Sequence, residues 1–175
     1  MTETAHPAIA MLARETQLRV GETPREIGGL TIAPGKQWLH EDSFLLVTES
    51  GLRFFYRQGD GVTVERPEHY DPAEEYLWCN GSIYAAIACI NGLYPIHASA
   101  VACNGQVFAF TGPSGAGKST LVAQLTRHDL PMFCDDTLVL DLTQPGQVLC
   151  MPGHKRLKLW PDAVELTGAK PAEQV

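Results

Sequence analysis

The segment from Gly112 to Ser119 constrains what this chain can fold into more than any other. It reads GPSGAGKS, Thr120 follows it, and it satisfies every position of the phosphate-loop pattern. Glycines allow the tight turns that aim several backbone N–H groups at one point, as a phosphate group requires. The alternative is a glycine-rich turn that only connects two elements, and the sequence on either side disfavours it.

A phosphate loop needs a strand before it and a helix after it, and this chain has both patterns. Residues 106–111 (QVFAFT) are a short run of strand-forming residues, and residues 119–127 (STLVAQLTR) place apolar side chains at helical spacing. The N-terminus of such a helix adds its own positive end to the site. We therefore expect ATP to bind at Gly112, Pro113, Ser114, Gly115, Ala116, Gly117, Lys118, Ser119 and Thr120.

Two of these residues carry specific chemistry. The Lys118 ammonium group is expected to reach the β- and γ-phosphates as a point charge. The Ser119 hydroxyl is expected to take one coordination position on Mg²⁺. The predicted cofactors are therefore ATP and Mg²⁺.

Composition limits the partners and the cellular compartment. The 175 residues suffice for one domain, or for one domain with a small appendage. A net charge of −7 disfavours a nucleic-acid partner, because an acidic surface repels phosphate backbones. The five cysteines form no CxxC pair, which is typical of free thiols in a reducing compartment. Without a signal-peptide pattern or a membrane-spanning apolar run, we expect a cytoplasmic protein with no membrane partner.

Residues 1–76 are expected to form a β-rich module. Candidate strands at 29–32, 44–48, 52–56 and 62–65 are separated by turns, several with glycine, as in a meander of hairpins. A helix is predicted from Asp71 to about Asn91, with a break or kink at Asn80-Gly81. The second predicted domain covers residues 77–175 and holds the phosphate loop.

A predicted hairpin brings a histidine to the loop. Asn104-Gly105 between two strands is typical of a two-residue turn, which pairs Cys103 with Gln106. Counting outward in step places His97 opposite Gly112, so we expect His97 near the phosphates. A histidine that caps a strand or packs in the core is the alternative.

Two carboxylates, Asp135 and Asp136, follow a short strand predicted over residues 130–134. In a parallel sheet, ligands gather at the carboxyl ends of strands, so this pair would face the phosphates. One carboxylate could hold Mg²⁺, and the other could accept a proton from an attacking hydroxyl. An acidic turn is the alternative, and the phosphate loop upstream favours the catalytic interpretation.

A cationic cluster, Lys155, Arg156 and Lys158, stands out in the acidic chain. It could hold phosphate or an acidic substrate, although the pattern is somewhat more typical of a solvated strand face. The sequence does not decide its role.

Four segments combine into a longer pattern: HASAV at 97–101, GPSGAGKST at 112–120, CDD at 134–136 and PGHKRLKLW at 152–160. Together they resemble the HPr kinase/phosphorylase family, and more narrowly its shorter relatives, which include kinases encoded with lasso-peptide clusters. The similarity covers about residues 77–166. It implies an α/β P-loop fold of the HPr kinase/phosphoenolpyruvate carboxykinase type and phosphorylation of a serine hydroxyl. It also implies that Asp135 is the catalytic base, that Asp136 supports Mg²⁺ or the substrate, and that His97 assists near the γ-phosphate.

Two differences from that family narrow the expectation. The Leu-Glu-Ile-Arg-Gly signature of HPr kinases is absent and RLKLW occupies roughly its place, so HPr itself is not the expected acceptor. The chain ends at Val175, whereas family members continue with further strands and helices. We therefore expect ATP binding with poor transfer unless the chain forms a homo-oligomer or a partner supplies the missing surface.

The leading expectation is an ATP-dependent serine kinase that acts on a peptide or small protein. Two alternatives stay open. One is a nucleotide-binding sensor or remnant without transfer activity, and the other is a small-molecule kinase.

Overall fold

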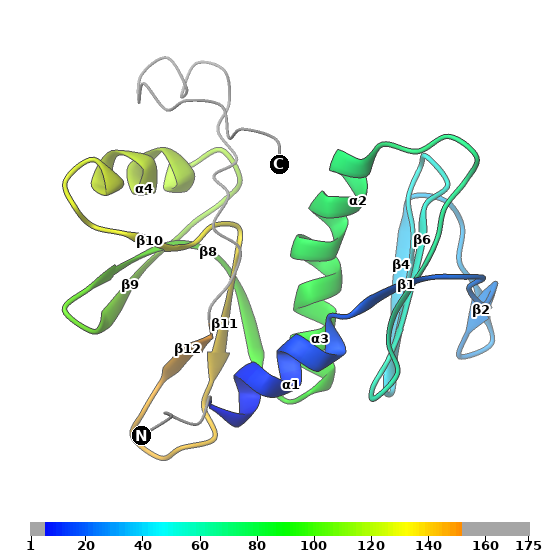
Figure 1. Ribbon diagram of the computed structural model, residues 1–175, viewed down its shortest axis with the longest axis horizontal. Helices are drawn as coiled ribbons and strands as arrows, with labels where there is room; N and C mark the ends of the chain where they lie inside the picture. Colours follow the sequence, from blue (N-terminus) through cyan, green and yellow to red (C-terminus); the bar gives the residue numbers. More distant parts are fainter. Residues whose placement is uncertain (1–5, 152–175) are drawn as a thin grey trace. The chain divides into compact units, whose positions relative to one another are not determined.

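The computed structural model describes residues 6–151, and the chain divides into two compact units, Met1–Tyr94 and Pro95–Val175 (Figure 1). The predicted boundary between residues 76 and 77 lies earlier than this division, because the helices of residues 72–90 pack with the strands before them. The cationic cluster Lys155, Arg156 and Lys158 lies outside the described residues. Within residues 6–151, no helix is long and apolar enough to cross a bilayer.

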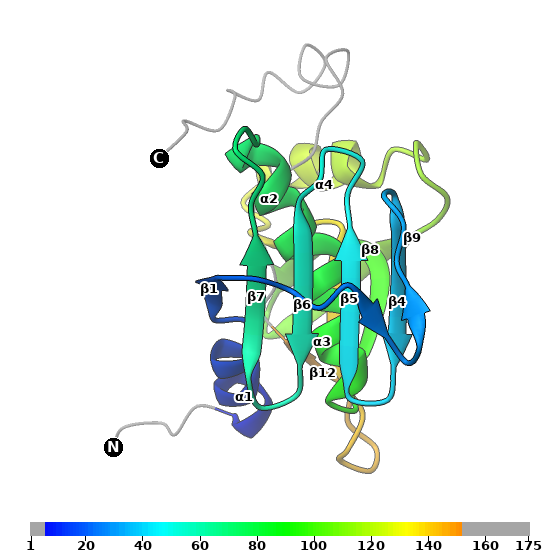
Figure 2. The same ribbon diagram turned by 90° about the vertical axis from the view of Figure 1, so that its right-hand side faces the viewer.

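The N-terminal unit is a sheet with helices on one face. Its elements are α1 (Pro7–Glu15), β1 (Leu18–Val20), β2 (Glu26–Ile27), β3 (Leu30–Thr31), β4 (Lys36–His40), β5 (Ser43–Val47), β6 (Arg53–Arg57), β7 (Gly61–Glu65), α2 (Pro72–Trp78), the π-helix η1 (Cys79–Ile83) and α3 (Tyr84–Ile90). The strand order is β1-β7-β6-β5-β4, with β1 parallel to β7 and the other pairs antiparallel. Figure 2 looks onto this sheet, with the helices behind it.

Burial explains which strands the sequence could predict. Strand β5 is buried at every residue, because the helices cover one face of the sheet and Ile27 and Ile32, from the β2–β3 segment, pack on the other. Strand β6 alternates, with Phe54 and Tyr56 fully buried. Strand β4 was not predicted, since all of its residues are exposed and its apolar pattern is weak.

The predicted helix from Asp71 to Asn91 is confirmed as a continuous helical segment. Asp71 caps α2 by accepting a hydrogen bond from the Ala73 N–H at 2.8 Å, and Pro72 occupies the first turn. The predicted irregularity at Asn80-Gly81 is the π-helix η1, which widens the helix without ending it. Ile83 and Ile87, one helical turn apart, are both buried.

A buried carboxylate, Glu15, ties three parts of the N-terminal unit together. Its oxygens accept hydrogen bonds from the Tyr56 hydroxyl at 2.9 Å and the Gly59 N–H at 2.8 Å, and the Arg14 guanidinium donates to it as well. Asn91 donates to the Tyr56 oxygen at 2.7 Å and so links the end of α3 to the same group. Burial alone would raise the pKa of Glu15, but these donors outweigh it and hold the pKa below its usual value.

The C-terminal unit is a small sheet with one helix. It contains β8 (Tyr94–Cys103), β9 (Gln106–Thr111), α4 (Lys118–Thr126), β10 (Met132–Cys134), β11 (Thr137–Asp141) and β12 (Leu149–Met151). The strand order is β10-β8-β11-β12, and β9 pairs with β8. Helix α4 lies over β10 and buries Val122 and Ala123 (Figure 1).

The predicted hairpin and its register are confirmed. Asn104 and Gly105 both have positive φ, at 49° and 75°, as a two-residue turn of this kind requires. Cys103 pairs with Gln106, and the ladder runs out to the pair Ala98 and Thr111. The next step outward places His97 level with Gly112.

The expectation of a parallel sheet around the loop is wrong, because the strand pairs β8–β9, β8–β10 and β11–β12 are antiparallel. Both β9 and β10 pair antiparallel with β8, and they lie on opposite sides of it because Ala100 and Val101 pair with both. The two strands are therefore parallel to each other with β8 between them. Their carboxyl ends still lie level with the same residue of β8, because Thr111 pairs with Ala98 and the Asp136 carbonyl accepts the Ala98 N–H at 3.3 Å.

Candidate functional site

The loop between β9 and α4 contains glycines with positive φ. Gly115 and Gly117 adopt φ of 80° and 83°, a region that glycine enters without steric cost. No described atom lies within 4 Å of the position that a Cβ would take on either residue. The backbone of the loop therefore borders open space, where a phosphate group can approach it.

The two chemically specific loop residues stand where α4 begins. The Lys118 ammonium group donates to the carbonyl oxygens of Gly112 and Pro113, at 2.9 and 3.1 Å, and so lies against the loop. Ser119 is the second residue of α4, next to the positive end of the helix dipole. A cation, a hydroxyl and a helix N-terminus thus converge on one loop.

Asp135 connects the strand β10 to this loop. Its Oδ1 atom accepts a hydrogen bond from the Ser119 hydroxyl at 2.8 Å, and the residue is 3% exposed. Ser119 lies at the start of α4 and Asp135 lies directly after β10. Because β9 and β10 run in the same direction, the residues that follow them lie at the same end of the sheet. The sequence predicted that both would belong to one site, and this contact joins them.

Asp136 lies beside His97 on a strained turn. The His97 Nδ1 atom is 2.9 Å from the Asp136 carbonyl oxygen and 3.6 Å from its Oδ1 atom. The Thr137 N–H bonds the Asp135 carbonyl at 3.0 Å across Asp136, whose φ is 74°. A non-glycine residue in this conformation stores strain, and such residues cluster at functional sites.

Four of the predicted site residues therefore form two separate pairs in the structure. Ser119 meets Asp135, and His97 meets Asp136. The sequence had assigned the metal to Ser119 and Asp136, whereas the carboxylate in contact with Ser119 is Asp135. Which carboxylate holds the metal and which takes the proton stays a prediction.

Sequence reasoning missed one residue of this cluster, Ser99. It lies on β8, is 1% exposed, and its hydroxyl donates to the same Asp135 Oδ1 atom at 2.5 Å. The signal was a hydroxyl between two alanines, two residues after His97, so that both side chains point to the same face of the strand.

The oxygen atoms at this end of the sheet suit Mg²⁺. A hydroxyl and carboxylates are hard ligands, and Mg²⁺ is commonly bound through one or two carboxylates together with water and substrate phosphates. Within residues 6–151, no group of three or more His, Cys, Asp or Glu side chains could hold a metal by itself.

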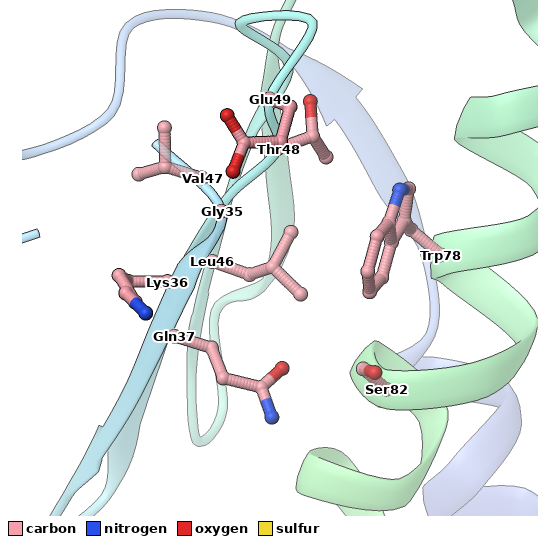
Figure 3. Close-up of a pocket in the computed structure, with 9 residues that line it drawn as sticks. All are labelled: Gly35, Lys36, Gln37, Leu46, Val47, Thr48, Glu49, Trp78 and Ser82. Atoms are coloured by element: carbon pink, nitrogen blue, oxygen red, sulfur yellow. The ribbon is translucent and has the colours of Figure 1, made fainter. Parts of the chain in front are cut away.

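A cavity lies in the N-terminal unit (Figure 3). It has a volume of about 500 Å³ and lies between the β4–β5 strands and the helical segment that carries Trp78 and Ser82. Gln37 and Leu46 point into it, whereas Lys36 points away. It gathers no group of titratable side chains aimed at one point, so it offers a binding surface but no evident chemistry.

Comparison with known proteins assigns no family. No protein-family model, no curated protein and no solved structure matches the chain. The resemblance to HPr kinases therefore rests on the four segments of the sequence and stays a prediction.

Proposed function

We propose that this protein is an ATP-dependent serine kinase that transfers the γ-phosphoryl group of ATP to a hydroxyl of a peptide or small protein. The observation that carries the proposal is the hydrogen bond between Ser119 of the phosphate loop and Asp135. A phosphate loop alone is compatible with many activities. The Asp135 carboxylate in contact with the loop, with Asp136 next to it in the chain, adds groups of the kind that phosphoryl transfer requires.

Each residue is given one role in this proposal. The loop N–H groups and Lys118 hold the β- and γ-phosphates, and the oxygen atoms of Ser119 and Asp136 would hold Mg²⁺. Bound Mg²⁺ supplies neutralisation of the charge on the phosphate oxygens. The oxygen of the acceptor hydroxyl forms a bond to the γ-phosphorus of ATP, and Asp135 accepts the proton of that hydroxyl. The bond between the γ-phosphorus and the bridging oxygen of the β-phosphate breaks, and ADP leaves. His97 assists near the γ-phosphate.

The contacts also support the reverse assignment of the two carboxylates. Asp135 lies next to the proposed metal ligand Ser119, and Asp136 is the more exposed of the two and lies beside His97. The variants Asp135→Asn and Asp136→Asn separate the assignments. The metal carboxylate is the one whose loss weakens the Mg²⁺-dependent part of ATP affinity, and the base is the one whose loss slows transfer without changing affinity.

The experiment is mass spectrometry of serine-containing peptides, beginning with those encoded beside the gene, after incubation with ATP and Mg²⁺. A phosphorylated serine that forms with the parent chain and not with Lys118→Ala supports the proposal. ATP binding without phosphorylation of any peptide or small molecule identifies a nucleotide sensor. Phosphorylation of small hydroxyl compounds alone identifies a small-molecule kinase, and either result contradicts the proposal.

A further inference from the structure

Ser99 places a buried hydroxyl on β8 between two buried alanines. Its neighbours Ala98 and Ala100 are fully buried and pack into the core of the C-terminal unit with Cys134 and Leu138. A hydroxyl inside protein is unfavourable unless it is hydrogen-bonded. Ser99 meets this requirement through Asp135, to which it donates at 2.5 Å.

Strand β8 supports both carboxylates of the site from one face. Side chains two residues apart on a strand point the same way, so His97 and Ser99 share the face opposite Ala98 and Ala100. His97 contacts Asp136, and Ser99 contacts Asp135.

The Asp135 carboxylate is held from two directions. Its Oδ1 atom accepts one hydrogen bond from Ser99 on the strand and one from Ser119 on the loop helix. Two donors on one oxygen fix the rotation of a carboxylate, which would otherwise turn about its terminal bond. Ser99 is fixed in the sheet, so it sets the direction from which Asp135 meets the loop.

We propose that Ser99 is a positioning residue, which holds the Asp135 carboxylate toward Ser119 at the phosphate loop. The expected effect of Ser99 on catalysis rests on the function proposed above, whereas the hydrogen bond between Ser99 and Asp135 does not depend on that proposal. A carboxylate misplaced by about 1 Å from its reacting partner can reduce a rate on the order of 10²-fold.

The test compares Ser99→Ala, which removes the hydroxyl, with Ser99→Thr, which keeps it. We expect Ser99→Ala to lower ADP formation from saturating Mg²⁺-ATP, with a pool of serine peptides, by roughly tenfold or more. The dissociation constant for Mg²⁺-ATP should stay within about twofold, because the loop is untouched. Ser99→Thr should restore the rate. Ser99→Cys, which preserves the size and weakens the donor, carries the test if Ser99→Ala does not fold.

A matched control removes an equivalent hydroxyl from the other unit. Ser43 is a buried serine on β5 whose hydroxyl donates to the Asp42 carboxylate at 2.7 Å. Ser43→Ala should leave ADP formation unchanged. A loss as large as that of Ser99→Ala would reduce the effect to general destabilisation and would overturn the proposal.

Nuclear magnetic resonance tests the hydrogen bond between Ser99 and Asp135 independently of kinase activity. The side-chain carboxyl ¹³C resonance of Asp135, assigned by its loss in Asp135→Asn, should move in Ser99→Ala and return in Ser99→Thr. An unmoved resonance overturns the proposal, and so does a moved resonance with an unchanged rate in an active chain. A parent chain that forms no ADP contradicts the proposed function instead, and the resonance alone then decides whether Ser99 positions Asp135.

Discussion

The two units each bury a carboxylate, Glu15 and Asp135, and hold it in different ways. Glu15 is 1% exposed and receives a tyrosine hydroxyl, a backbone N–H and a guanidinium from its own neighbourhood. Asp135 is 3% exposed and receives two serine hydroxyls, one of which belongs to Ser119 at the start of α4.

The difference separates a structural carboxylate from a candidate catalytic one. Glu15 joins α1, β6, the turn before β7 and, through Tyr56 and Asn91, the end of α3. Asp135 adjoins Asp136, a residue in a strained backbone conformation, at the meeting point of two strand ends. The account therefore predicts that Glu15 governs stability and that Asp135 governs transfer.

The largest expected effect is on transfer. Asp135→Asn should reduce phosphoryl transfer by roughly 10²-fold or more, because a base contributes in the transition state. Its Mg²⁺-ATP affinity should stay within a few-fold of the parent value. Single-turnover kinetics and calorimetry on the same preparation measure both quantities. Transfer at the parent rate in Asp135→Asn would show that Asp135 is not the catalytic base.

The matching change in the other unit should act on stability. Glu15→Gln keeps the shape of the side chain but loses charge-assisted hydrogen bonds, so the free energy of unfolding should fall by about 2 kcal/mol. Mg²⁺-ATP affinity should not change. Urea denaturation followed by circular dichroism gives the free energy. An unaltered unfolding midpoint would show that the Glu15 network contributes little.

A smaller effect should appear in the pH dependence of stability. The pKa of Glu15 is lowered in the folded chain, so its stabilising contribution is present above the usual glutamate pKa of about 4.3 and is lost as pH falls through the folded-state pKa. The difference in unfolding free energy between parent and Glu15→Gln should thus be full at pH 7 and shrink below about pH 4. Denaturation curves at the two pH values test this, and a constant difference would contradict it.

Local signals explain what could be predicted from the sequence. The Asn104-Gly105 turn fixed the register of β8 and β9, and the Asp71-Pro72 pair fixed the start of α2. Both depend on residues that are adjacent in the chain. The strand before residues 112–117 and the helix after them were predictable for the same reason.

Contacts between distant residues could not be predicted in this way. Nothing in the apolar pattern of α1 indicates that Glu15, at its end, is buried under Tyr56. The Ser99–Asp135 contact depends on the pairing of β10 with β8, which no local pattern reveals. The assignment of Asp136 to the metal came from the resemblance to HPr kinases, whereas the carboxylate that accepts the Ser119 hydrogen bond is Asp135.

The most direct test of the central claim is a calorimetric titration of the parent chain and Lys118→Ala with ATP in the presence of Mg²⁺. The account predicts that the parent chain binds and that Lys118→Ala binds at least about tenfold more weakly, because it loses the side-chain cation directed at the β- and γ-phosphates. Equal affinity in the two chains would contradict the assignment of residues 112–120 as the nucleotide site.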